Sequence, residues 1–104
     1  MIIDTEYCVA RHKRSIAELS RHQDGTWQIN RVFIQPEDRK KGIGRALLNQ
    51  AIFDAIDQGA EKIFVIPGGY NLNQEEQYQF YEKCGFQHDT LKRGLMWYKN
   101  IIPL

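Results

Sequence analysis

"QPEDRKKGIGRALLNQ", residues 35–50, places a cluster of basic residues and two glycines directly before an apolar helical pattern. The first amides of a helix have no partner within the helix, and they lie at the positive end of its dipole. Gly42 and Gly44 lack a Cβ, so an anion such as a pyrophosphate could approach the backbone there. Charge-assisted hydrogen bonds would come from Arg39, Lys40, Lys41 and Arg45. These residues alone leave three interpretations open: a phosphate cradle, a solvated loop and a nucleic-acid patch.

The periodicity of apolar residues changes at this stretch. Before it, alternation and turn residues predict three antiparallel strands, and after it a three- and four-residue spacing predicts a helix. The elements expected along the chain are strands at 5–12, 15–22 and 26–34, a helix at 43–58 ending at Gly59, a strand at 62–67, a helix at 74–85 and a strand at 95–102. The helical crossover makes the strands at 26–34 and 62–67 parallel, and the wholly apolar 62–67 is expected to be covered on both faces.

These elements predict an α/β (α+β) fold with a mixed, mostly antiparallel central sheet and helices on its faces. A chain of 104 residues predicts a single domain spanning 1–104. Its net charge of +1, with 14 basic and 13 acidic residues, argues against nucleic acid as a partner, in spite of "RHKR" at 11–14. No apolar run is long enough to cross a membrane, so no membrane partner is expected.

The cysteines and histidines of the chain do not form a metal-binding motif. Cys8 and Cys84 lie far apart in the sequence, which predicts two reduced thiols in a cytoplasmic protein. His12, His22 and His88 are scattered, so no metal site is expected.

Two motifs resemble those of a known family. "Ile34-x-Pro36-x-x-Arg39-x-x-Gly42-x-Gly44-x-x-Leu47" is similar to the acetyl-CoA-binding motif of the GCN5-related N-acetyltransferase (GNAT) superfamily, and "FYEKCGF" at 80–86 resembles its second signature. The resemblance implies a GNAT-like fold with a splayed parallel strand pair. It also implies an N-acetyltransferase that moves acetyl from acetyl-CoA, its co-substrate, to a primary amine by direct attack.

The resemblance assigns roles to individual residues. Tyr81 matches the general acid that protonates the departing coenzyme A thiolate, although a tyrosine at this position can also be a core residue with a satisfied hydroxyl. Amides on the splayed strand would bind the pantetheine arm and polarise the thioester carbonyl, and Asn73 or Asn71 would replace an asparagine of the family pattern. The cofactor-binding residues expected are Val32, Phe33, Ile34, Arg39, Lys40, Lys41, Gly42, Ile43, Gly44, Arg45 and Asn73.

Several departures from the family pattern leave alternatives open. The strand at 26–34 has no carboxylate to act as general base, so Glu18, Glu37, His88 or a water chain remains as the candidate. The chain starts directly in a hairpin, without the usual N-terminal strand and helices, which implies an acceptor site that is open or is completed by a second subunit.

An open acceptor site suits a protein or peptide amine better than a small molecule that needs enclosure. The alternative function is a catalytically weak acetyl-CoA or CoA-binding module that regulates a partner protein. The terminal "LMWYKNIIPL" fits either a homodimer contact or a covered internal strand.

Overall fold

The computed structural model describes residues 7–68 and 74–99 of the chain. Within them, six strands form one sheet in the order β1-β2-β3-β4-β6-β5. The elements are β1 (Tyr7–His12), β2 (Ser15–Arg21), β3 (Trp27–Phe33), the 3-10 turn η1 (Pro36–Asp38), α1 (Ile43–Asp57), β4 (Ile63–Val65), α2 (Gln74–Lys83), β5 (Phe86–His88) and β6 (Met96–Tyr98). The mixed, mostly antiparallel sheet with one parallel pair and two helices confirms the expected fold class.

The N-terminal half is a three-stranded antiparallel meander, as the alternation of its sequence predicts. β1 pairs with β2 from Tyr7↔Ser20 to His12↔Ser15, and Lys13 adopts a left-handed backbone in the tip. The second turn is held by Asp24, whose Oδ1 accepts hydrogen bonds from the Thr26 amide at 2.9 Å and the Thr26 hydroxyl at 2.7 Å. Both hairpin predictions are therefore confirmed.

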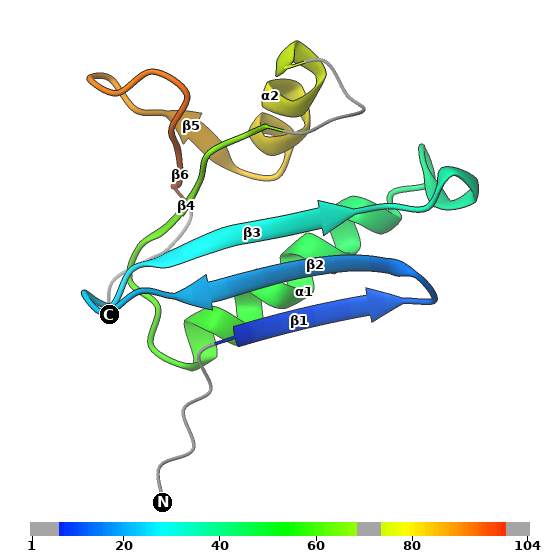
Figure 1. Cartoon of the computed structure of the whole chain (residues 1–104), viewed down its shortest axis with the longest axis horizontal. Coiled ribbons are helices and arrows are strands. Elements are labelled where there is room, and N and C mark those ends of the chain that lie inside the picture. The colour runs from blue at the N-terminus through cyan, green and yellow to red at the C-terminus, as the bar shows by residue number, and fades with distance from the viewer. Residues whose placement is uncertain (1–6, 69–73, 100–104) are drawn as a thin grey trace, which may run out of the picture.

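α1 covers one face of this meander and forms most of the core with it. Figure 1 shows the helix behind β1–β3, while no described helix lies over the opposite face of these strands. The helix buries the middle of its apolar stripe, and small residues on both sides allow a close approach. The buried contacts of helix and strands come from Leu47, Leu48, Ala51, Ile52 and Ala55 on α1 and from Cys8, Ala10, Ala17, Leu19 and Ile29 on the sheet.

The C-terminal half differs from the sequence-based expectation in three ways. β5 was not expected, because three residues of Phe86–His88 are too short for a recognisable alternation. The last strand is limited to Met96–Tyr98 in the described part, and residues 100–102 of the expected strand lie outside it. The expectation that 62–67 is covered on both faces is wrong: Ile63 and Val65 are buried, but Phe64 is half-buried and Ile66 is 60% exposed.

β3 contains a bulge that shifts its side-chain alternation. Leu19 of β2 pairs with Ile29, whereas the preceding Glu18 pairs with Arg31, so Asn30 is the extra residue. Trp27 and Ile29 face the core before the bulge, and Val32 and Ile34 pack against it afterwards. An extra residue bends a strand and changes the direction of the residues that follow. The bulge therefore redirects the end of β3 that leads into the glycine-rich loop.

Candidate active site

β3 and β4 are paired only where they begin. Their parallel pairing consists of Trp27↔Ile63 and Gln28↔Phe64, although β3 continues to Phe33 and β4 to Val65. Beyond these two pairs, the edge of β3 that faces β4 has no strand partner among the described residues. Unpaired backbone N–H and C=O groups are strong hydrogen-bonding groups that a ligand can satisfy. The geometry matches the splayed strand pair that the resemblance implied.

A buried polar pair, Ser15 and Asp38, anchors the loop from β3 to α1. The Ser15 hydroxyl donates to Asp38 Oδ2 at 2.8 Å, and its oxygen accepts from the Gln35 amide at 2.9 Å. Ser15 is fully buried and Asp38 is 4% exposed. Neither residue was predicted from the sequence, because they are 23 positions apart and Asp38 stands at an unspecified position of the glycine-rich motif. The pair fixes the start of β2 to the loop that precedes the helix.

The helix begins at Gly42, whose backbone is left-handed with φ +79°. No side chain caps α1 at this end, and its first turn carries no acidic residue. A Cβ on Gly42 would meet nothing within 4 Å, so the surroundings of this residue are open. An uncapped helix start with open surroundings fits a phosphate group, which can accept hydrogen bonds from the amides.

Gly44 has a different reason for being glycine than the sequence suggested. It is buried, and a Cβ there would lie 3.0 Å from Ile34 Cγ1 and 3.5 Å from Phe80 Cε1. The missing side chain thus makes room for packing between three elements rather than for direct access by a ligand. Because Phe80 belongs to α2, this contact also brings the two sequence motifs together at the start of α1.

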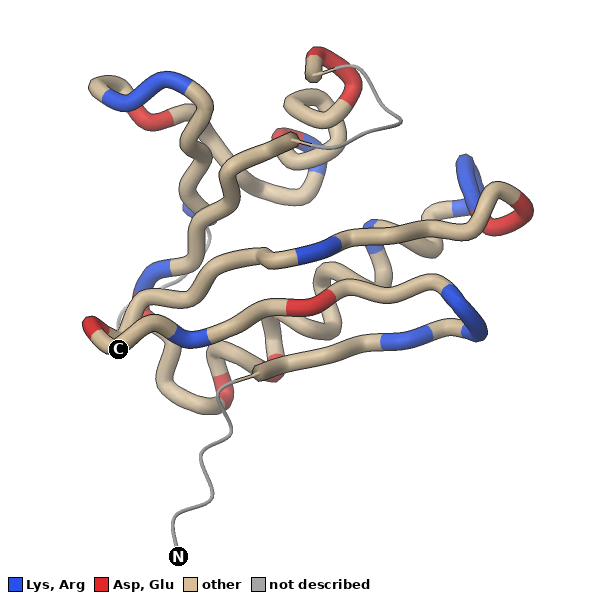
Figure 2. The backbone as a smooth tube through the Cα atoms, in the orientation of Figure 1, with Lys and Arg blue, Asp and Glu red and all other residues tan. Residues whose placement is uncertain are grey.

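The basic side chains of the loop are exposed around the helix start. Figure 2 shows that the backbone of this basic loop lies at the same end of the molecule as the basic residues of the β1–β2 tip. Arg39 has a structural bond as well, because its Nε donates to the Ile34 carbonyl at 3.0 Å. Lys40 adopts a left-handed backbone with φ +63°, which shapes the turn before Gly42. The exposed cations in this loop and first turn are Arg39, Lys40, Lys41 and Arg45.

The remaining expected cofactor residues lie on β3 and at the helix start. Val32, Ile34 and Ile43 are half-buried and pack against the core, so a role for them would use backbone groups. Phe33 is 42% exposed at the end of β3. Asn73, like Asn71, lies outside the described residues.

Tyr81 lies on α2, one residue beyond the contact with Gly44. It is 8% exposed and makes edge-on ring contacts with Phe80 at 5.1 Å and Phe86 at 5.7 Å. Burial, with a smaller contribution from Cys84, raises the pKa of the Tyr81 phenol to about 12. Among the described residues, none forms a hydrogen bond with its hydroxyl. The phenol is therefore a protonated donor at neutral pH.

The candidate general bases occupy different environments. Glu18 is half-buried on β2, opposite Arg31 and beside the bulge in β3. Glu37 is exposed in η1. His88 is exposed on β5. Its Nε2 lies 3.7 Å from Glu82 Oε1, and its ring centroid lies 4.8 Å from that of Tyr78. The position of Glu18 next to the splayed strand makes it the candidate nearest in the sheet to the expected thioester site.

Neither a metal site nor a membrane-spanning helix is found among residues 7–68 and 74–99. No group of three or more His, Cys, Asp or Glu side chains is arranged to hold a metal ion there. No helix in that part of the chain is long and apolar enough to span a bilayer.

Comparisons with known proteins identify the class that this fold and site define. The family described as "Acetyltransferase (GNAT) domain" matches residues 4–88. The chain belongs to this family.

Two curated relatives match over part of the chain. The tRNA(Met) cytidine acetyltransferase TmcA of Actinobacillus pleuropneumoniae is 33% identical over 60 residues, which are 58% of this chain and 10% of TmcA. The uncharacterized N-acetyltransferase MJ1207 of Methanocaldococcus jannaschii is 33% identical over 67 residues, 64% of this chain and 28% of that protein. The match thus covers less than a third of either relative's length.

Solved structures share the fold at lower identity. The anti-CRISPR protein AcrVA5 superposes with a TM-score of 0.73 at 20% identity, over 89% of this chain and 98% of that chain. The PaiA N-acetyltransferase of Thermoplasma acidophilum, solved in complex with coenzyme A, gives a TM-score of 0.67 at 22% identity over 82% of this chain and 52% of that chain.

Proposed function

We propose that the protein transfers the acetyl group of acetyl-CoA to a primary amine of a protein or peptide, by direct attack of the amine on the thioester. The single observation that carries the proposal is the meeting of the two motifs at Gly44, where the open start of α1 lies next to the α2 segment that holds Tyr81. Family membership supplies the reaction class, and the curated relatives are both acetyltransferases by name.

The residues around the splayed strands fit acetyl-CoA by their chemistry. Uncapped amides at the start of α1 and the cations Arg39, Lys40, Lys41 and Arg45 suit a pyrophosphate. The unpaired edge of β3 offers amides of Val32, Phe33 or Ile34 to a pantetheine arm and to a thioester carbonyl. Amides held in place before the reaction stabilise negative charge that develops on that oxygen.

In the proposed reaction the amine nitrogen forms a bond to the acetyl carbon, and the bond from that carbon to sulfur breaks. The amine loses a proton to the general base, for which we propose Glu18. Tyr81 gives its hydroxyl proton to the departing sulfur, so that coenzyme A leaves as a thiol.

A binding test and a turnover test separate this function from the alternative of a CoA-binding regulator. We expect acetyl-CoA to raise the thermal midpoint and lysine-containing peptides to cause release of free thiol. Peptide N-termini, small amines and cytidine complete the panel, since the TmcA relative is named for acetylation of cytidine in tRNA. Binding without thiol release for any amine would favour the regulator, and no thermal shift would refute both functions.

A pair of lysines provides a matched control for the phosphate cradle. Lys40 and Lys13 are both exposed and both adopt a left-handed backbone, with φ +63° and +55°. We expect Lys40→Gln to weaken acetyl-CoA binding about fivefold, roughly the value of one exposed charge-assisted contact. Lys13→Gln should leave the affinity unchanged. Equal effects of the two substitutions would mean that the loop before α1 does not hold the phosphates.

A further inference from the structure

The face of the sheet opposite α1 exposes more apolar surface than a solvated face needs. On β1, Tyr7 and Val9 alternate with the core residues Cys8 and Ala10, and they are 56% and 40% exposed. At the far side of the same face, Ile66 follows β4 and is 60% exposed. Because β2 and β3 separate these residues, only an extended partner that crosses the face could cover all of them.

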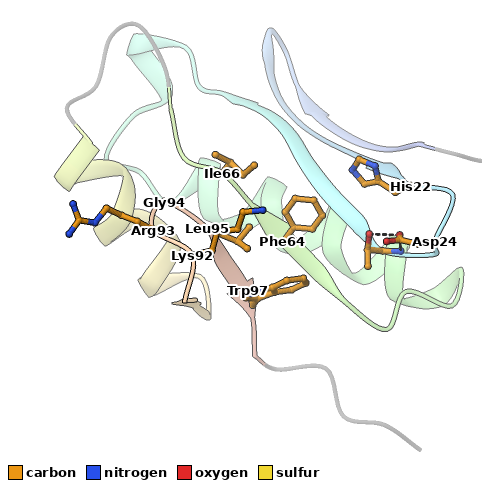
Figure 3. A pocket seen from close by; sticks show the side chains of 10 residues that line it. His22, Asp24, Phe64, Ile66, Lys92, Arg93, Gly94, Leu95 and Trp97 are labelled. Carbon is orange, nitrogen blue, oxygen red and sulfur yellow. Dashed lines mark hydrogen bonds between the residues drawn. The ribbon is translucent and has the colours of Figure 1, made fainter. Parts of the chain in front are cut away.

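A cavity of about 310 Å³ lies beside β4 and β6 on this side of the sheet (Figure 3). Three rings follow one another along it: His22 stacks on Phe64 with centroids 5.6 Å apart, and Phe64 lies 5.5 Å from Trp97. Ile66 and Leu95 add apolar walls. The volume is at the lower end of the range for ligand pockets, about 300 to 1,000 Å³.

Hydrogen bonds outside the cavity hold the outer two rings in place. His22 Nε2 lies 2.8 Å from Gln28 Oε1, and Trp97 Nε1 donates to Asp89 Oδ2 at 2.9 Å. The other oxygen of Asp89 accepts from the amides of Leu91 and Lys92. A ring whose orientation is already fixed loses little conformational entropy when a second ring packs on it.

The charges around the cavity favour an anionic group at one end. Lys92 and Arg93 line it and are exposed. Asp24 lines the other end, where its carboxylate accepts two hydrogen bonds from Thr26, and these bonds lower its pKa. Asp89 is bonded to Trp97 and to its own loop. Lys92 also helps to lower the pKa of Asp89, and Figure 3 shows the Arg93 side chain pointing away from the rings. The two exposed cations nevertheless make the end near Gly94 the positive end of the cavity, which favours an acidic partner there.

We propose that this cavity holds an aromatic side chain of the polypeptide acceptor, with an acidic residue of that polypeptide against Lys92 and Arg93. A polypeptide is favoured over a free small molecule because it can cover Tyr7, Val9 and Ile66 on the same face while one side chain fills the cavity. That the bound polypeptide is the acetyl acceptor rests on the proposed function, whereas binding of a polypeptide in the cavity does not.

Trp97 allows the site to be tested directly by nuclear magnetic resonance. Its indole ring lines the cavity, so its N–H signal reports on binding there, whereas the other tryptophan, Trp27, is 1% exposed in the core. The probe is the capped dipeptide N-acetyl-Phe-Glu-amide, compared with the Phe-Gln, Phe-Lys and Ala-Glu dipeptides, without acetyl-CoA. We expect the Trp97 signal to shift and the Trp27 signal to stay. Replacing Glu by Gln should weaken binding about threefold, and replacing Phe by Ala should abolish the shift.

Variants with matched controls distinguish binding in the cavity from nonspecific binding to the protein surface. Ile66→Asp should abolish the shift, whereas Phe53→Asp should not, because Phe53 is equally exposed at 59% but lies on α1. Lys92→Gln with Arg93→Gln should remove the preference for Glu over Gln. The same change at the exposed Lys13 and Arg14 should preserve it.

Each outcome decides one of the two proposals. A Trp97 shift without thiol release from any lysine side chain or peptide N-terminus would support the cavity and refute the proposed transfer. Thiol release with no shift at Trp97 for any probe would refute the cavity and leave the transfer standing. Tighter binding of free 3-phenylpropionate than of the Phe-Glu dipeptide would overturn the polypeptide as occupant.

Discussion

Gly44 at the start of α1 lies directly against Ile34, the residue that follows β3. A Cβ on Gly44 would be 3.0 Å from Ile34 Cγ1 and 3.2 Å from its Cδ1. The splayed strand and the long helix therefore meet at a position where a Cβ would fit only if the Ile34 side chain shifted by a few tenths of an ångström. Because Phe80 of α2 closes the same contact, Gly44 fixes the relative position of the three elements that form the candidate active site.

Replacing Gly44 with alanine should destabilise the protein by about 1–3 kcal/mol, the usual cost of inserting a methyl group into a packed contact. For a domain of this size that corresponds to a decrease of the thermal midpoint by roughly 4–8 °C per kcal/mol. Acetyl-CoA affinity should decrease as well, because Ile34 must move at the end of β3. Thermal unfolding and calorimetric titration measure the two effects.

The double variant Gly44→Ala with Ile34→Ala serves as the control for that prediction. Truncating Ile34 removes both atoms that the new Cβ would approach, so the second substitution should cost less in the Gly44→Ala background than alone. Additive losses in a double-mutant cycle would show that the two residues do not contact each other as described.

Gly42 should respond differently, because its constraint is conformational. Gly42→Ala creates no close contact but forces a left-handed backbone on a residue with a Cβ, which costs about 1–2 kcal/mol. The new methyl group would also project into the open space around Gly42. We expect a larger loss of acetyl-CoA affinity per kcal/mol of lost stability than for Gly44→Ala. If affinity is retained, the phosphates do not lie at this helix start.

Much of the fold follows from local periodicity, and what the sequence analysis missed depends on tertiary contacts. The bulge in β3 was not predicted, although the sequence carries a trace of it: apolar residues occupy odd positions at Trp27 and Ile29 and even positions at Val32 and Ile34. By contrast, the exposure of Ile66 depends on what packs beside β4, which an apolar run alone does not indicate.

The residues of the candidate site also fall into two groups: those that the sequence predicts and those that only the fold brings together. The glycines and the cations of 39–45 form a contiguous motif, so their grouping could be predicted from the sequence. Ser15 and Asp38 meet only because the strand order brings the start of β2 under the loop. The three rings of the further cavity are His22, which follows β2, Phe64 of β4 and Trp97 of β6. They are far apart in the sequence and form no linear motif.

Tyr81→Phe tests the proposed general acid. The substitution keeps the ring contacts with Phe80 and Phe86 and removes the hydroxyl, so stability should change little. We expect kcat to decrease about 100-fold or more, the typical contribution of a general acid, with acetyl-CoA affinity unchanged. An unchanged kcat would refute the assignment.

The pH dependence of the wild-type rate provides a second test of Tyr81. Since its pKa is raised to about 12, the phenol stays protonated as the pH rises from 7 to 10. Ionisation of Tyr81 should therefore cause no loss of kcat in that range. A loss of kcat near pH 10 that is absent from Tyr81→Phe would contradict the raised pKa.

Ser15→Ala should show how strongly the buried polar pair holds the loop. It removes the hydroxyl that bonds Asp38 and Gln35, and it leaves a carboxylate that is 4% exposed without this donor. We expect a loss of about 1–3 kcal/mol in unfolding free energy and a weaker acetyl-CoA complex. Ser20→Ala, half-buried on the same strand, is the control and should have a small effect on both. Equal losses would mean that the Ser15 hydroxyl contributes nothing specific to the loop.

Cys84 and Cys8 should be unreactive in the folded protein, which bears on the mechanism. Burial raises the pKa of the Cys84 thiol to about 11, although Arg45 opposes the shift, and burial also raises the pKa of Cys8. Because the thiolate is the nucleophile, few molecules carry one at pH 8, and iodoacetamide labelling followed by mass spectrometry should be slow until urea unfolds the chain. Labelling of native protein should accelerate as the pH approaches 11, and Arg45→Gln should slow it at Cys84. Rapid native labelling of Cys84 at pH 8 would contradict this prediction and would reopen an acetyl-cysteine intermediate in place of direct attack.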